Sequence, residues 1–419
     1  MKVKNLLLAG LAVAAMTACS NNDEIIDNGV QTPTEEASMR INLKFANEGT
    51  RAASGDTDEG EDFERNSATV TAIIEYPNTN KKLVFKDLEL VNDGNGNKYT
   101  TEAFTVEAAS GVKVYAIINS KDQSITANTN LAGLKVGVQT LPQSGLAYIA
   151  GTVAENNAFL MSGSVENINI VGGNDQNVAP ITVTRVAAKL DQQTTLNTEF
   201  PITDTDYNVT GVSVKLLEFS YSNLSSDSYV FGDNKASVEG WLQPYQVAGT
   251  DPASDVYRWI KDGITYCLEN NNSLNPTRIH YKGQVCINNE ALTEDFYIRA
   301  ITFDNVTTYR LFKSWNELTE YYGDDAIAAL DNTNRETLRK YGIMRYIGGI
   351  CYYEADITTE YPAPAVVSVL RNNWYQLTVS KIGKIGLPTP AQEPTPDETM
   401  LTITSTVKPW TIQVIDLEL

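Results

Sequence analysis

Near the start of the chain, apolar and polar side chains alternate. Residues 39–45 read MRINLKF, with apolar side chains at Met39, Ile41, Leu43 and Phe45. Successive residues of a β-strand point to opposite faces, so this period of two places all four side chains on one face. Their burial would stabilise a fold by about 6–12 kcal/mol. The pattern predicts a strand with one buried face.

The segment after this strand contains no apolar run. Residues 47–62 read NEGTRAASGDTDEGED, and Arg51 is the only basic residue among them. Such a composition is typical of an exposed loop, where proteolysis concentrates. A cut between Arg51 and Ala52 would separate the strand from the body of the protein and leave an open groove. The alternative is a plain first strand that stays in place.

Short strand-like runs, bounded by turn residues, continue along the chain. The first group lies at 68–76, 82–90, 104–106, 112–119, 158–163, 166–171 and 178–186, and the second at 209–220, 257–268, 279–287, 295–303, 344–357, 365–370 and 374–382. Short strands at regular spacing with almost no long helix are typical of β-sandwiches. We predict an all-β protein with two β-sandwich domains, residues 52–189 and 190–386.

Two stretches differ from the strand pattern. Residues 314–322 and 325–340 carry apolar side chains at helical spacing, which predicts a small helical insertion in the second domain. Residues 91–97, VNDGNGN, have the Asp and Asn residues of a calcium loop but not its later ligands or closing glutamate. A hairpin turn is the favoured interpretation, because Asn-Gly and Asp-Gly provide the positive φ of tight turns.

The end of the sequence combines a stalk with an apolar strand. Residues 385–399 contain four prolines, and such an extended linker would reach about 40 Å. Residues 387–419 are therefore expected to form a linker and a terminal β arm, with a bulge near Ile415 where the alternation changes phase. The apolar positions of this arm are Val407, Trp410, Ile412, Val414, Leu417 and Leu419.

The first residues indicate export. Two lysines precede an apolar run at 6–16, and small residues lead from this run to Cys19. The run is too short to span a bilayer, and its ending is similar to a bacterial lipobox, in which the cysteine is acylated, for example with palmitate. We expect a lipoprotein signal peptide at 1–18 and a lipidated propeptide at 19–51, held in the cell outer membrane. The alternative is ordinary secretion with an incidental cysteine.

The net charge limits the classes of partner, and the cysteines limit the possible disulfides and metal sites. The 419 residues carry a formal charge of −20, which argues against nucleic acid and anionic membrane surfaces. Beyond Cys19 the chain has three cysteines, Cys267, Cys286 and Cys351. Their odd number and spacing fit neither a disulfide framework nor a metal cluster. Cys267 and Cys286 could pair across a hairpin, but free buried cysteines are the favoured interpretation.

Evidence for catalysis is poor. His280 is the only histidine, which excludes a two-histidine metal site and weakens a Ser-His-Asp proposal. The sequence has neither a phosphate-binding glycine loop nor a GxSxG motif. Its 52 acidic residues could include a pair of catalytic carboxylates, as in a glycosidase, but nothing singles out a pair. We expect no enzymatic activity, no cofactor and no metal.

Several short segments match one known family. They are the lipobox at Cys19 and residues 50–52, 104–119, 161–163, 184–190, 371–375 with 379–388, and 407–410. On these segments the chain resembles the fimbrillins that build type V pili, closest to the group of the minor-fimbrium major subunit. The segments after residue 370 are the most specific, whereas residues 220–345 match weakly.

The resemblance implies two transthyretin-like β-sandwich domains and a strand-exchange polymer. In this family an arginine-specific protease removes the N-terminal strand of an exported lipoprotein, and the C-terminal arm of another subunit fills the groove. Here it implies cleavage between Arg51 and Ala52, a removable strand at 39–45 and a donor strand at 407–419. The chain would then be a structural pilin that passes from the cell outer membrane to an extracellular fimbrium. Its partners would be further copies, related fimbrial subunits and the maturation protease.

Two other functions stay open. A tip or adhesive subunit would use residues 220–345, with their many tyrosines, to contact a glycan or a host protein. A monomeric carbohydrate-binding surface lipoprotein would form no polymer under any protease treatment.

Overall fold

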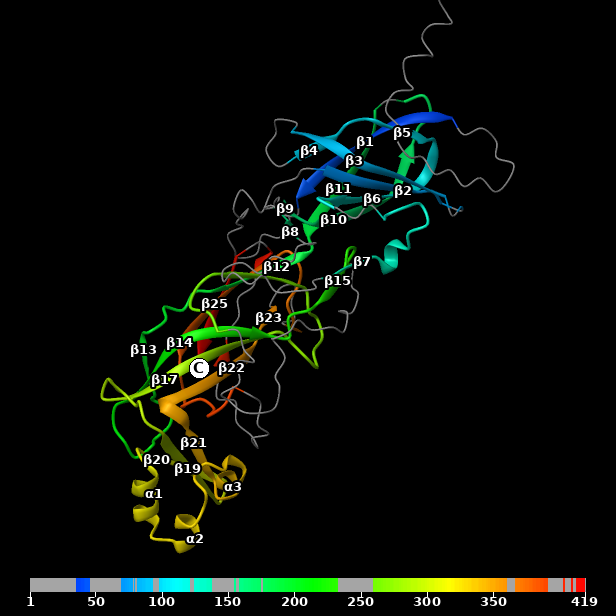
Figure 1. The fold of residues 1–419 in the computed structure, drawn as a ribbon. Coiled ribbons are helices and arrows are strands. Elements are labelled where there is room, and N and C mark those ends of the chain that lie inside the picture. The colour runs from blue at the N-terminus through cyan, green and yellow to red at the C-terminus, as the bar shows by residue number, and fades with distance from the viewer. Residues whose placement is uncertain are drawn as a thin grey trace, which may run out of the picture. The chain divides into compact units, whose positions relative to one another are not determined.

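The computed structural model describes residues 35–45, 69–77, 79, 81–92, 98–120, 124–137, 154–155, 158–174, 176–232, 259–359, 366–390, 402–403, 408–409 and 412–418. They are mostly strands, so the predicted all-β class is confirmed (Figure 1). Two compact units can be separated. The first contains the described residues within Met1–Phe45, Ala68–Asn130 and Gly163–Val183, and the second contains the others. The predicted domain limits stay predictions.

Eight strands, whose pairing closes on itself, build the first unit. Their order is β11-β10-β6-β2-β3-β4-β1-β5, and β11 also pairs with β1. The strands are β1 (Glu36–Phe45), β2 (Thr69–Glu75), β3 (Lys82–Asn92), β4 (Lys98–Thr101), β5 (Phe104–Glu107), β6 (Ala109–Ile118), β10 (Met161–Ile170) and β11 (Asn177–Arg185). Closure leaves few unpaired edges in this unit.

Burial in the first unit follows the sequence pattern. Along β11, Ala179, Ile181 and Val183 are buried while Val178 is exposed, as expected for a strand with one face on the core. Five consecutive residues of β2, 70–74, are buried, as expected for a strand covered on both faces. The predicted strands at 158–163 and 166–171 are instead parts of β9 (Ala158–Phe159) and the longer β10.

Two larger sheets build most of the second unit. One contains β16 (Ile264–Leu268), β12 (Ala187–Gln192), β25 (Asn373–Lys381), β28 (Ile412–Glu418), β26 (Thr402–Ile403) and β27 (Lys408–Pro409). The other contains β13 (Glu199–Pro201), β14 (Val212–Ser222), β17 (Arg278–Ile287), β18 (Glu290–Ala291) and β22 (Ile350–Asp356). Their inner faces provide buried side chains such as Val214, Phe219, Tyr281 and Leu377.

Smaller pairings complete the second unit. They are β15 (Asp227–Tyr229) with β7 (Lys135–Gly137), β23 (Thr358–Thr359) with β24 (Val366–Val367), β8 (Ala154–Glu155) with β9, and a three-stranded sheet of β20 (Val306–Phe312), β19 (Phe296–Phe303) and β21 (Ile343–Tyr346). Two 3₁₀ turns lie at Leu131–Gly133 and Ile347–Gly349.

The predicted helical insertion lies between β20 and β21. It consists of α1 (Trp315–Tyr322), α2 (Asp325–Ala328) and α3 (Arg335–Lys340). Each helix has a side-chain N-cap, from Ser314, Asp324 and Asn334, that accepts a hydrogen bond from a backbone N–H of the first turn. One buried side chain per helix, Leu318, Ile327 and Leu338, packs against Tyr297, Phe312 and Ile343. This contact fixes the helices on the three-stranded sheet.

Candidate functional site

The first strand is paired on both of its edges. β1 runs parallel to β11, from Met39 opposite Asn177 to Phe45 opposite Val183. On its other edge β1 is antiparallel to β5 and then to β4. Both rows of backbone groups of β1 therefore have neighbours. Removal of β1 would leave two facing unpaired edges, which is the groove expected from the sequence.

The buried face of β1 is apolar. Met39, Ile41 and Leu43 are 0% exposed, whereas Arg40 is exposed. Burial of these three side chains stabilises the first unit by about 4.5–9 kcal/mol. The alternation predicted for this strand is present, although the side chain of Phe45 lies outside the described residues.

Two polar side chains also hold β1 in place. The Nδ2 group of Asn177 donates to the carbonyl of Ser38 at 3.0 Å, and the backbone N–H of Ile41 donates to Oγ1 of Thr101 at 3.0 Å. Thr101 is 0% exposed and Asn177 is 6% exposed. A buried polar group that loses its partner costs about 1–3 kcal/mol. The groove left by β1 would thus favour an occupant with its own backbone N–H and C=O groups.

Several predicted site residues lie outside the described residues. These are Cys19, Arg51, Ala52, Val407, Trp410 and Leu419. Of Ile412, Val414 and Leu417 only the backbone is described. The roles expected for all of these residues stay predictions.

The C-terminal strand pairs with the second unit of its own chain. β28 runs parallel to β25, from Ile412 opposite Trp374 to Glu418 opposite Lys381, and antiparallel to β26 (Figure 1). The pairing shifts register in β25 between Val379 and Lys381, opposite Leu417 and Glu418. The bulge predicted near Ile415 was therefore misplaced, because the irregularity lies in the partner strand β25, opposite Leu417 and Glu418.

The segment 371–375 fixes the start of β25. Nε and Nη2 of Arg371 donate to the two carboxylate oxygens of Glu269, at 3.0 and 2.6 Å, and its Nη1 donates to the carbonyl of Val230 at 2.9 Å. The arginine and glutamate side chains are each 11% exposed. Asn372 has a φ of 58°, and its backbone N–H donates to the carbonyl of Ala187 at 2.7 Å. These contacts position β25, with which β12 and β28 pair.

Trp374 and Tyr375 extend this arrangement along β25. Nε1 of Trp374 donates to Asp191 at 3.0 Å, and Nζ of Lys189 lies 3.9 Å from the centre of the indole ring. The hydroxyl of Tyr375 is 2.7 Å from Oγ1 of Thr359. Both motifs singled out in the sequence, 184–190 and 371–375, are thus in contact.

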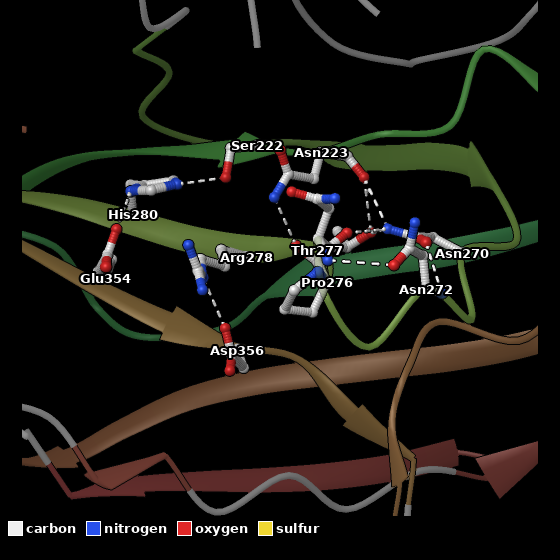
Figure 2. A network of polar contacts seen from close by, with 11 residues as sticks. Ser222, Asn223, Asn270, Asn272, Pro276, Thr277, Arg278, His280, Glu354 and Asp356 are labelled. Carbon is white, nitrogen blue, oxygen red and sulfur yellow. Dashed lines mark hydrogen bonds and ion pairs between the residues drawn. The ribbon is translucent and has the colours of Figure 1, made fainter. Parts of the chain in front are cut away.

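Figure 2 shows a polar network at β17, on which His280 lies. Nε2 of His280 is 2.6 Å from Oγ of Ser222, and Nδ1 is 3.8 Å from Glu354. Burial, together with the positive charge of the nearby Arg278, lowers the pKa of His280 to about 3. Burial outweighs the distant carboxylate, so the imidazole is neutral at pH 7 and forms no ion pair with Glu354. This favours the structural interpretation of the histidine.

The same network includes an asparagine-rich loop. Nδ2 of Asn270 donates to the carbonyls of Asn223 and Asn275 and to Oγ1 of Thr277, at 3.1, 2.9 and 3.2 Å (Figure 2). The Thr277 hydroxyl in turn donates to the carbonyl of Asn223 at 3.0 Å. The donors of the Asn270 side chain are used in holding the loop backbone. The network therefore fixes the loop that leads into the first residue of β17.

The three cysteines of the second unit are free and buried. Burial raises the pKa of the Cys351 thiol to about 12 and that of Cys267 above its usual value. The favoured interpretation of free cysteines is confirmed, and no bond joins Cys267 to Cys286. Among the described residues no group of three His, Cys, Asp or Glu side chains could hold a metal ion. No helix in the same part of the chain is long and apolar enough to cross a membrane.

The β19–β20 hairpin carries an exposed apolar tip. Phe303 is 77% exposed and Val306 is 64% exposed. Nearer the base, Arg299 lies opposite Arg310, and their guanidinium groups stack on Tyr322 and Tyr321 at 4.0 and 4.2 Å. Two like charges in directly opposed positions of a hairpin are unfavourable by themselves. We call Phe303, Val306, Arg299, Arg310 and Tyr321 the hairpin surface.

Residues 330–416 match the family model described as "Major fimbrial subunit protein type IV, Fimbrillin, C-terminal". The C-terminal part of the chain is therefore similar to the C-terminal part of fimbrillins. The matched range includes the segment 371–375, β25 and most of β28. The resemblance to fimbrillins found in the sequence is confirmed.

Solved structures of cell adhesion and fimbrial proteins are similar to this chain at low identity. A proposed cell adhesion protein from Parabacteroides distasonis ATCC 8503 shares 13% identity over 92% of this chain and 98% of its own, with a TM-score of 0.48. The tip fimbrial protein Mfa3 from Porphyromonas gingivalis, with C-terminal truncation, shares 12% identity over 82% of this chain and 94% of its own, with a TM-score of 0.38. The fimbrial anchor protein Mfa2 from the same organism shares 11% identity over 66% of this chain and 98% of its own, with a TM-score of 0.26. No curated protein matches the chain in sequence.

Proposed function

We propose that this protein is a structural subunit of a cell-surface fimbria and polymerises by strand exchange. The observation that carries the proposal is the position of β1, which is paired on both edges and fully buried on one face. In the sequence this strand is followed by a polar segment with Arg51 as the only basic residue between 47 and 62. One cut after Arg51 would expose the groove without any change in the other strands.

The groove sets requirements for its new occupant. A strand that replaces β1 in the same direction is parallel to β11 and antiparallel to β5 and β4. It places apolar side chains opposite Asn177, Ala179 and Ile181, where Met39, Ile41 and Leu43 lie in the precursor. Pairing of the backbone provides affinity, and alternate side chains provide register.

The C-terminal arm of another copy meets these requirements. Ile412 and Val414 are two residues apart and can enter the same face of a groove. β28 is paired with β25 of its own chain, so donation to a neighbour requires release from that pairing. The gain on docking is the apolar burial and the backbone pairing that the first unit lost with β1.

Maturation follows the order implied by the sequence. The precursor is exported as a lipoprotein with its lipid on Cys19, which holds it in the cell outer membrane. An arginine-specific protease cuts between Arg51 and Ala52 and releases the subunit from its lipid together with β1. The released subunits then enter an extracellular fimbrium with further copies and related fimbrial subunits.

The test is cleavage of purified protein that begins at Ser20. After treatment with an arginine-specific protease, we expect a new N-terminus at Ala52 and an SDS-resistant ladder of high-mass species. Arg51→Ala should abolish both, whereas the control Arg65→Ala, which removes the next arginine in the sequence, should retain both. A ladder from the Arg51→Ala variant would refute cleavage at Arg51 as the trigger. Cutting at Arg51 without a ladder would refute polymerisation of this chain with itself.

A second candidate function is adhesion at the fimbrial tip, favoured by the hairpin surface. Its opposed arginines and exposed phenylalanine suit contact with an acidic partner that also presents apolar groups. Immunogold labelling distinguishes the two functions, because a shaft subunit is labelled along the fibre and a tip subunit only at its end. A monomeric carbohydrate-binding lipoprotein would give neither labelled fibres nor a ladder.

A further inference from the structure

Three tyrosine hydroxyls converge on the segment that leads to the C-terminal linker. The backbone N–H of Ile385 donates to the hydroxyl of Tyr207 at 2.9 Å. The hydroxyl of Tyr353 donates to the carbonyl of Lys384 at 2.9 Å, and that of Tyr346 donates to the carbonyl of Gly386 at 3.0 Å. Three consecutive residues are thus each held by a different tyrosine. We call residues 384–387 the linker root.

The tyrosines come from three separate places in the second unit. Tyr207 precedes β14, Tyr346 ends β21 and Tyr353 lies on β22. Lys384, Ile385 and Gly386 lie outside the strands. Buried backbone groups without partners are costly, and the phenols supply those partners. Burial raises the pKa of all three phenols, so they are neutral donors or acceptors at pH 7.

Two further contacts fix the linker root. Leu387 and Tyr352 exchange backbone hydrogen bonds of 2.7 and 2.8 Å. A Cβ atom on Gly386 would lie 2.3 Å from the carbonyl oxygen of Tyr352, so only glycine permits this approach. The side chain of Ile385 is 2% exposed. The chain is therefore anchored directly before the proline-rich stretch.

We propose that Tyr207, Tyr346 and Tyr353 are positioning residues that fix the linker root and make it the load-bearing attachment of the donor arm. This inference rests on the proposed function, in which the linker joins each subunit to the strand it donates. Tension along a fibre then reaches the second unit at residues 384–387. Bonds from three elements to consecutive residues share this load, so the root resists peeling better than a single contact would.

The experiment replaces each tyrosine by phenylalanine in the full chain, singly and together. Tyr375→Phe is the matched control, because its hydroxyl is also buried and accepts from the backbone N–H of Leu370 at 2.7 Å. We first measure hydrogen exchange at the amides of Ile385 and Leu387 in the uncleaved protein. Tyr346→Phe and Tyr353→Phe should each accelerate this exchange at least tenfold, although neither hydroxyl bonds these amides. Unchanged exchange, or equal acceleration by Tyr375→Phe, would overturn the anchor.

The second measurement is the force that extends or ruptures single fibres. Fibres of the triple variant should yield at lower force than wild-type fibres, and fibres of the Tyr375→Phe control should not. An unchanged force would refute the load-bearing role. Failure of the cleaved wild-type protein to polymerise would refute the proposed function instead, and the exchange measurement on the uncleaved protein would still test the anchor by itself.

Discussion

Truncation of Ile41 should destabilise the precursor and leave the fibre unaffected. Ile41 is 0% exposed on the buried face of β1. Replacement by alanine removes three carbon atoms, which corresponds to about 2.4 kcal/mol of lost transfer free energy. The cavity left behind raises the loss, so we expect about 2–5 kcal/mol in the uncleaved protein. In the proposed mechanism the fibre no longer contains this strand, so the stability of the fibre should not change.

Urea denaturation of the Arg51→Ala protein, with and without Ile41→Ala, measures the first effect. SDS and heat resistance of the ladders formed from the cleavable proteins measures the second. Arg40→Gln is the control, because its exposed side chain on the same strand should change stability by at most about 0.5 kcal/mol. A fibre weakened by Ile41→Ala to the same degree as the precursor would refute strand removal, because the substituted residue would then still be present.

Three further predictions concern the second unit. Arg371→Ala leaves the buried Glu269 carboxylate without its charge partner. The free energy of unfolding measured in urea should fall by about 3–5 kcal/mol, and a second substitution, Glu269→Gln, should recover part of this loss. The pKa of His280 is about 3 in the folded protein and about 6.5 in the unfolded protein, so the unfolded state binds more protons below pH 6.5. The free energy of unfolding should therefore decrease as the pH decreases, by about 2 kcal/mol between pH 6.5 and 5. His280→Gln should remove this pH dependence, which no other histidine can supply. The thiols of Cys267, Cys286 and Cys351 are buried and should react with iodoacetamide only in denaturant, as mass spectrometry of the chain from Ser20 would reveal; labelling of the native protein would contradict their burial.

Local patterns in the sequence predicted most of the elements. The alternation at 39–45 predicted β1 with its buried face, because the core selects apolar side chains at every second position. The helical spacing at 314–340 predicted the insertion, since Leu318 and Leu338 are its buried contacts. Both signals lie within a few residues of sequence and need no knowledge of the partner elements.

β20 was missed because its hairpin has an unusual turn. Asp304 and Asn305 both adopt positive φ, of 49° and 62°, without the glycine that usually identifies such a turn. Beyond the turn, Val306 is exposed, so the strand does not begin with a buried residue. The stacked Arg299 and Arg310 were missed for the same reason, since they become neighbours only when β19 and β20 pair.

Pairing between distant segments could not be predicted from local patterns. Arg371 was singled out as part of a motif, but its partner Glu269 lies 102 residues away. The parallel pairing of β1 with β11 joins residues separated by more than a hundred positions. The linker root was missed because Tyr207, Tyr346 and Tyr353 share no spacing, and their common target is backbone. Such contacts depend on how all the strands of a unit are arranged in space.

β1 in the first unit and β12 in the second unit are alike in pairing but differ in connection. β12 is parallel to β25, with Lys189 opposite Trp374, just as β1 is parallel to β11. Val186 alone separates β12 from β11, so the chain enters β12 directly from a paired strand. Removal of β12 would require two cuts, and the cut before it, at the buried Val186, would divide the protein. β1 needs only one cut, in the polar segment after it. In the proposed mechanism, strand exchange therefore opens a groove in the first unit, while the second unit remains intact and carries the arm that it donates.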